Sequence, residues 1–242
     1  MLIGNLKQFG ILSIVLCLVP VVGGCSRKPA TQNGPKAKAG TKIPLNFDQT
    51  KKDAQQGDAA AQNLLGEIWL KGDGAPPDAK AAADWFKKSA DQGNASAQFN
   101  LGTLFEAGQG VPLDYARAVE WYRKAAEQGH AAAQYSLAAM YVYGRGVERN
   151  DAQALHWLAK AAHQGDALAQ FAMGERCRTG TGVPKDLVEA FKWFMLSSGQ
   201  NVSDATTLLN DIKAQMNRDQ IAEGRKRARQ FVPKTSPASG GK

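Results

Sequence analysis

The sequence predicts an all-α protein, a right-handed α-solenoid of helix-turn-helix repeats with a period of 36 residues. Two kinds of residue carry this period. Tryptophan recurs every 36 residues, at Trp85, Trp121, Trp157 and Trp193. Glycine series with the same spacing begin at Gly57, Gly72 and Gly74. A single pair of helices cannot bury its apolar stripes, whereas stacked pairs can, so a regular period of this length indicates a solenoid.

The first 46 residues are expected to lie outside the repeats. An apolar run follows Lys7 and ends at Cys25, which predicts a signal peptide at 1–24 rather than a retained membrane anchor. The residues Val-Gly-Gly-Cys at its end resemble the bacterial lipobox. That resemblance implies that Cys25 is lipidated, and Ser26 after it implies sorting to the outer membrane. Residues 25–46 are rich in Lys, Ala, Gly and Pro, the composition of a flexible tether.

The remaining chain divides at the period. We expect a half repeat at 47–57, four full repeats, capping helices at 202–232 and a disordered tail at 233–242. The four repeats are 58–93, 94–129, 130–165 and 166–201. In the second of them, apolar residues at i, i+4, i+7 and i+8 from Ala97 share one helix face. Gly108 and Gly110 then break the helix, and Asp114 is placed to cap the next one.

One motif recurs in each repeat. It reads Ala-x-x-x-Leu-Gly, then Gly-x-Gly-Val, then Asp-x-x-x-Ala-x-x-Trp-Tyr-x-Lys-Ala-Ala and a closing Gly, and it is nearly complete from Ala97 to Gly129. This pattern resembles the Sel-one-like repeat, which is related to the tetratricopeptide repeat but longer than its 34 residues. The resemblance implies an adaptor that binds other proteins or peptides and has no catalytic motif. Two local departures are Ala138 in place of the motif's glycine and Cys177 in place of an aromatic residue.

Charge is distributed unevenly along the chain. Residues 53–217 hold 15 Lys and Arg against 19 Asp and Glu, whereas both flanking segments are basic. Basic segments at both ends are better suited to binding anionic lipid or polysaccharide than to binding nucleic acid, because a nucleic-acid site needs the positive charge on one folded face. At the carboxyl end, a basic strip comprises Arg225, Lys226, Arg227 and Arg229. The strip is either a solvated face of a capping helix or a contact for an anionic partner.

Catalysis is not expected. The histidines His130, His156 and His163 have no metal-ligand or catalytic-triad spacing. Cys177 stands where other repeats have aromatic residues, which favours core packing over a nucleophilic role. We therefore predict no enzyme activity, no metal site and no cofactor.

The first helix of each pair usually lines the binding face of such a solenoid. Residues there that differ between repeats are free of the packing pattern, so Glu67, Glu106, Glu175 and Arg178 are the predicted partner contacts. The resulting hypothesis is a membrane-anchored interaction scaffold of the bacterial cell envelope, on the outer membrane facing the periplasm. Its partners would be other envelope proteins or peptides, with no nucleic acid. The alternative is a polysaccharide- or peptidoglycan-associated binding lipoprotein.

Overall fold

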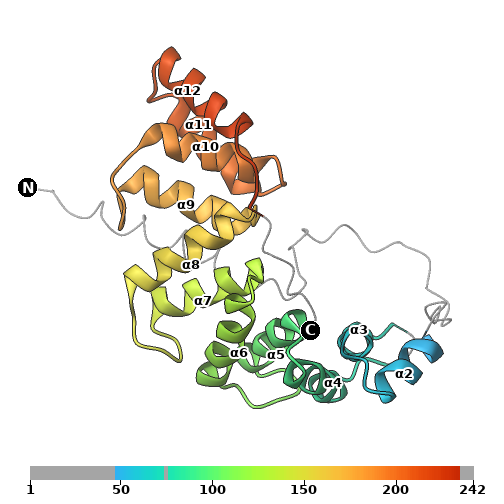
Figure 1. Cartoon of the computed structure of the whole chain (residues 1–242). Helices are drawn as coiled ribbons and strands as arrows, with labels where there is room; N and C mark the ends of the chain where they lie inside the picture. Colours follow the sequence, from blue (N-terminus) through green and yellow to red (C-terminus); the bar gives the residue numbers. More distant parts are fainter. Residues whose placement is uncertain (1–46, 74–75, 235–242) are drawn as a thin grey trace, which may run out of the picture. The chain divides into compact units, whose positions relative to one another are not determined.

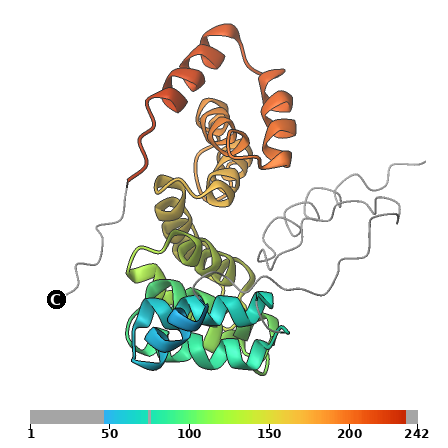
Figure 2. The same ribbon diagram turned by 90° about the vertical axis from the view of Figure 1, so that its right-hand side faces the viewer.

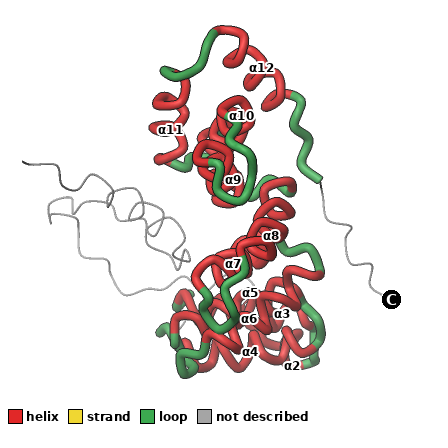
Figure 3. The backbone as a smooth tube through the Cα atoms, turned by 90° about the vertical axis from the view of Figure 1, so that its left-hand side faces the viewer, coloured by secondary structure: helices red, strands yellow, loops and turns green. Residues whose placement is uncertain are grey.

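The computed structural model describes residues 47–73 and 76–234 (Figure 1). Cys25, the predicted signal peptide, the whole predicted tether and most of the predicted tail lie outside these residues. Within the described ranges every regular element is an α-helix, as the sequence predicts (Figure 3). None of these helices is long and apolar enough to cross a membrane. The chain forms two compact units that divide after Asp114.

The first unit contains four described helices in which each helix packs on the next. They are α2 (Phe47–Gln55), α3 (Ala59–Lys71), α4 (Ala79–Asp91) and α5 (Ala95–Ala107). The second unit contains seven. They are α6 (Tyr115–Glu127), α7 (Ala131–Tyr143), α8 (Asp151–His163), α9 (Ala167–Thr179), α10 (Leu187–Ser198), α11 (Ser203–Lys213) and α12 (Arg218–Arg229). Here α6 to α11 pack in chain order, and α12 returns to pack on α10. The chain after α12 then runs back toward α8 (Figure 2).

The first helix of each of the four repeats is capped in the same way at both ends. These first helices are α3, α5, α7 and α9. Each begins with a side chain that accepts a hydrogen bond from the backbone N–H three residues later, and these caps are Asp58, Asn94, His130 and Asp166. Each ends at a glycine in the left-handed conformation, which avoids the clash that a Cβ would cause. These glycines are Gly72, Gly108, Gly144 and Gly180. Local sequence therefore sets the length of these helices.

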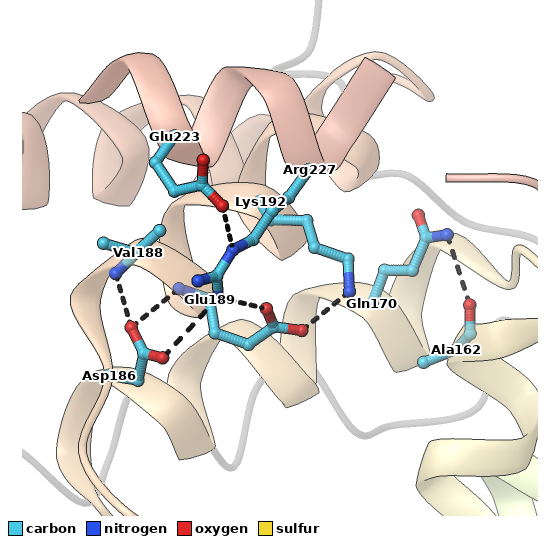
Figure 4. Close-up of polar contacts among 8 residues, drawn as sticks. All are labelled: Ala162, Gln170, Asp186, Val188, Glu189, Lys192, Glu223 and Arg227. Carbon is cyan, nitrogen blue, oxygen red and sulfur yellow. Dashed lines mark hydrogen bonds and ion pairs between the residues drawn. The ribbon is translucent and has the colours of Figure 1, made fainter. Parts of the chain in front are cut away.

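A buried glutamine ties each first helix to the helix before it. Gln62, Gln98, Gln134 and Gln170 each donate a side-chain hydrogen bond to a carbonyl eight residues earlier, at 3.0 to 3.3 Å. Gln170, for example, donates to the carbonyl of Ala162 (Figure 4). A second glutamine then donates to the buried one at 2.7 Å in the pair Gln164 and Gln134. Because a buried amide without partners is costly, these bonds explain why glutamine follows the 36-residue period.

Glycine lets the two helices of a pair approach closely. A Cβ on Gly66 would lie 2.6 Å from the ring of Phe86, and a Cβ on Gly174 would lie 2.6 Å from the ring of Phe194. In the third repeat, Ala138 takes the place of these glycines. Leu158 stands there in place of the phenylalanine, and it has no ring to collide with an alanine. The sequence departure at Ala138 is thus matched by a smaller partner on the facing helix.

Candidate functional site

In the first unit, the predicted contact Glu67 belongs to a polar network on α3 and α5. Asn63 Nδ2 donates to Glu67 Oε1 at 2.9 Å, and Asn100 Nδ2 donates to Asn63 Oδ1 at 3.0 Å. Lys71 Nζ lies 3.8 Å from Glu67 Oε2. Glu106 on α5 is only 9% exposed. Glu67 is therefore the more accessible of the two carboxylates.

In the second unit, Glu175 and Arg178 form a pair on α9. Arg178 Nε donates to Glu175 Oε1 at 2.7 Å, and Arg178 Nη2 donates to Oε2 at 2.9 Å. The hydrogen bond to Glu175, with the charge of Glu175 and of Asp211 on α11, raises the pKa of Arg178. The guanidinium side chain remains 35% exposed. Glu175 occupies the Nε and Nη2 edge of the guanidinium, so the Nη1 donors are the ones that can bind a carboxylate or carbonyl on a partner.

Asp211 belongs to this surface but is absent from the predicted set. It lies 36 residues after Glu175, so continuing the period past the fourth repeat identifies it. The four predicted contacts divide between the two units, with Glu67 and Glu106 in the first and Glu175 and Arg178 in the second. Each unit therefore carries its own polar first-helix surface.

The basic strip on α12 is not uniform. Arg227 Nε donates to Glu223 at 2.9 Å, and Arg227 Nη1 reaches Glu189 of α10 at 3.3 Å (Figure 4). Asp186 lies 3.8 Å from the same Nη1 atom. Arg227 thus joins α12 to α10. Arg225, Lys226 and Arg229 are exposed.

His130, His163 and Cys177 occupy structural positions, whereas His156 is exposed. His130 Nδ1 accepts a hydrogen bond from the backbone N–H of Ala133 at 3.2 Å, and burial lowers the pKa of this imidazole. The ring of His163 lies edge-on to Trp193, with 5.4 Å between ring centroids. Cys177 is 5% exposed, and burial raises the pKa of its thiol to about 11. Over the part of the chain that is described, no three His, Cys, Asp or Glu side chains gather to hold a metal ion.

A cavity of ≈ 890 Å³ lies in the second unit, where the end of α6 faces α8. Its apolar wall is formed by Ala152, Leu155 and Ala159 of α8. Lys160 of α8 and Glu127 at the end of α6 contribute charged groups to the lining. No sequence pattern indicates this cavity, because its walls come from second helices and from the chain end.

Comparisons with known proteins agree with the repeat geometry. The Sel1 repeat model matches residues 59–94, 95–130, 131–166 and 167–200, well over half of the chain. Among curated proteins no relative matches.

Many solved structures are similar, and three of them illustrate the range. A Sel1 repeat protein from Oxalobacter formigenes is 34% identical with a TM-score of 0.62, over 77% of this chain and 80% of that one. A protective antigen of uropathogenic Escherichia coli with an SLR fold is 29% identical with a TM-score of 0.53. That match covers 78% of this chain but only 48% of the antigen. A sel1 repeat protein from Klebsiella pneumoniae subsp. pneumoniae is 23% identical with a TM-score of 0.51, over 76% and 97% of the two chains, and supports the fold alone.

These matches confirm the predicted α-solenoid class and its period of about 36 residues. Proteins built from such repeats generally mediate protein–protein interactions and are typically not enzymes. The chain therefore belongs to the Sel1 repeat family, a relative of the tetratricopeptide repeat proteins.

Proposed function

We propose that this protein is a membrane-anchored scaffold of the bacterial cell envelope that holds other envelope proteins on its first-helix surfaces. The contrast between two positions of the repeat carries the proposal. The buried glutamine is the same in all four repeats, whereas the position five residues later holds Glu67, Thr103, Ala139 or Glu175. Packing fixes the first position. The second varies in size and charge between repeats, and although Ala139 is buried, the polar residues Glu67, Thr103 and Glu175 are available there to serve a partner.

The anchor is proposed from the sequence of the first 26 residues. Acylated Cys25 would hold the chain on the outer membrane, on the periplasmic side. At about 0.8 kcal/mol per buried methylene group, two or more acyl chains would make the attachment stable.

A Cys25→Ser variant tests the anchor. We expect the wild-type chain to sediment with membranes and Cys25 to carry acyl groups by mass spectrometry, whereas the variant becomes soluble. Cys177→Ser is the matched control, since it removes the buried thiol and should leave the chain on the membrane. Membrane sedimentation of Cys25→Ser equal to that of the wild type would contradict the anchor.

Capture of envelope proteins tests the scaffold. The chain from Ser26 onward is used as bait at low salt and at about 0.15 M, where the Debye length is about 8 Å. We expect discrete proteins to remain at the higher salt and to be lost when Glu67, Glu175 and Arg178 are all changed to Gln.

The second candidate is a polysaccharide- or peptidoglycan-binding lipoprotein, favoured by the exposure of Arg225, Lys226 and Arg229. Changing these three residues to Gln gives the matched control for the capture experiment. A scaffold keeps its partners in this variant. Binding of isolated peptidoglycan that is lost with the three basic residues, and lost steeply with salt, would favour the alternative and contradict the scaffold.

A further inference from the structure

Residues 231–234, which follow α12, pack against the second helices α8 and α10. After α12, residues 231–234 run back along α10 and α8 (Figures 2 and 3). The ring of Phe231 lies 5.7 Å from Trp193 and 6.4 Å from His163, centroid to centroid. Lys192 Nζ lies 3.9 Å from the Trp193 centroid and 5.8 Å from that of Phe231. His163, Trp193 and Lys192 therefore form an aromatic site with a cation beside it, which is called the tail site below.

Two further contacts hold this segment in an extended form. Pro233 lies beside Gly165, where an added Cβ would be 3.6 Å from the proline ring. The backbone N–H of Lys234 donates to the carbonyl of His163 at 2.9 Å. That carbonyl belongs to the last turn of α8, whose final carbonyls have no partner within the helix. The segment thus binds through three of its own groups: the ring of Phe231, the ring of Pro233 and the backbone N–H of Lys234.

The cavity in the second unit is the counterpart of the tail site one repeat earlier. Glu127, His156 and Gly129 line it, and they lie 36 residues before His163, Lys192 and Gly165. Trp157 takes the place of Trp193, with the ring of His156 edge-on at 5.2 Å. The tail fills the later site, whereas the earlier site leaves ≈ 890 Å³ open, with Lys234 on its wall.

We propose that this cavity binds an extended segment of a partner protein that presents an aromatic side chain followed two residues later by proline. The aromatic ring lies beside Glu127 and His156, the counterparts of His163 and Lys192, and next to the apolar wall of Ala152, Leu155 and Ala159. The proline lies over Gly129, and the backbone donates to the end of α6. Residues 235–242, which follow Lys234 in the sequence, contain no aromatic or large apolar side chain that could serve as this ring.

The inference deepens the protein-binding role proposed above but uses a different surface. The probe is a fluorescent peptide with the sequence of residues 229–235, Arg-Gln-Phe-Val-Pro-Lys-Thr, measured by anisotropy against the chain from Ser26 onward. Residues 1–25 contribute nothing to the described structure. We expect Ala152→Trp, an exposed position on the cavity wall, to weaken binding about tenfold or more by filling the space. Ala116→Trp is the matched control, since Ala116 is the exposed counterpart on α6 and should change binding by less than about twofold.

Phe231→Ala separates the cavity from the tail site. If the peptide binds the cavity, Ala152→Trp weakens binding whether or not Phe231 is present. If binding is insensitive to Ala152→Trp but rises in Phe231→Ala, the peptide is replacing the tail beside Trp193, and the proposal is wrong. A peptide with Phe changed to Ala should not bind, and equal binding of the two peptides would also overturn it. Neither result bears on the first-helix surface, which is tested separately by the Glu67, Glu175 and Arg178 variant.

Discussion

His130 shows how one repeat position constrains ionisation. The equivalent caps are Asp58, Asn94 and Asp166, which accept a hydrogen bond at any neutral pH. His130 accepts through Nδ1, so the cap requires the neutral imidazole. Burial lowers the pKa of His130 below its usual 6.5. The neutral form is thus favoured in the folded state, and the stability it contributes is complete above pH 6.5 and declines as the pH falls.

We predict that His130→Asn removes this loss of stability at low pH. Its free energy of unfolding should match or exceed that of the wild type at pH 7. Its advantage should grow toward pH 5 to about 1 kcal/mol, the usual value of a helix cap. Urea denaturation at the two pH values measures the difference, and parallel pH profiles for both chains would show that the cap does not depend on the imidazole charge.

Cys177 is expected to be unreactive in the folded chain. With a pKa of about 11, only about one thiol in a thousand is ionised at pH 8, and the thiolate is the reactive form. In the chain from Ser26 onward, which contains no other cysteine, a disulfide reagent at pH 8 should react about 100-fold more slowly than in urea. Equal reaction rates with and without urea would show that the thiol is accessible in the folded chain, and a chemical role for Cys177 would then have to be considered. The raised pKa also means that stability falls as the pH rises above about 9, where the unfolded thiol ionises first.

At the scale of helices, glycine and phenylalanine act as a matched pair. Gly174→Ala gains helix propensity of about 1 kcal/mol but drives a Cβ into the ring of Phe194. We expect a net loss of about 1 to 3 kcal/mol, because overpacking a close helix contact forces the chain to shift. Leu158 opposite Ala138 indicates how the repeat accommodates the methyl group. Gly174→Ala combined with Phe194→Leu should therefore cost at least about 1 kcal/mol less than the sum of the single changes. Chemical denaturation of the four chains gives this coupling energy, and strict additivity would rule out the pairing.

At the scale of the molecule, each helix packs mainly on its neighbours in the chain. Stability in such an array is close to a sum of local terms, so damage stays near its source. We predict that Gly174→Ala speeds amide hydrogen exchange in α9 and α10 far more than in α2 to α4. Mass spectrometry of exchanged peptides measures this, with Gly66→Ala as the control that places the effect in the first unit. Uniform acceleration in both variants would indicate one cooperative core instead.

The fold was predictable because the residues that repeat every 36 positions each have a local structural role. Glycines at helix ends, caps such as Asn94, and apolar stripes such as that of α5 act over one or two turns, so sequence alone identifies them. The candidate site was only partly predictable. Glu67 and Glu175 could be selected as variable positions of the first helices. The residues that complete their networks from other helices could not, since Asn100 bonds Asn63 and Asp211 acts on Arg178. Arg227, assigned to a basic strip, instead joins α12 to α10.

The sequence by itself determined the repeat, its period, the helix ends and the positions that packing leaves free, because each depends on contacts within one repeat. Tertiary structure alone decided which side chains meet across repeats. Gly174 meets Phe194, and Arg227 meets Glu189, only after the helices stack. Phe231 reaches Trp193 because α12 reverses the chain toward α8, and this return also brings Lys234 to the open cavity. No local pattern encodes such a return, since it depends on how the last helix packs on α10.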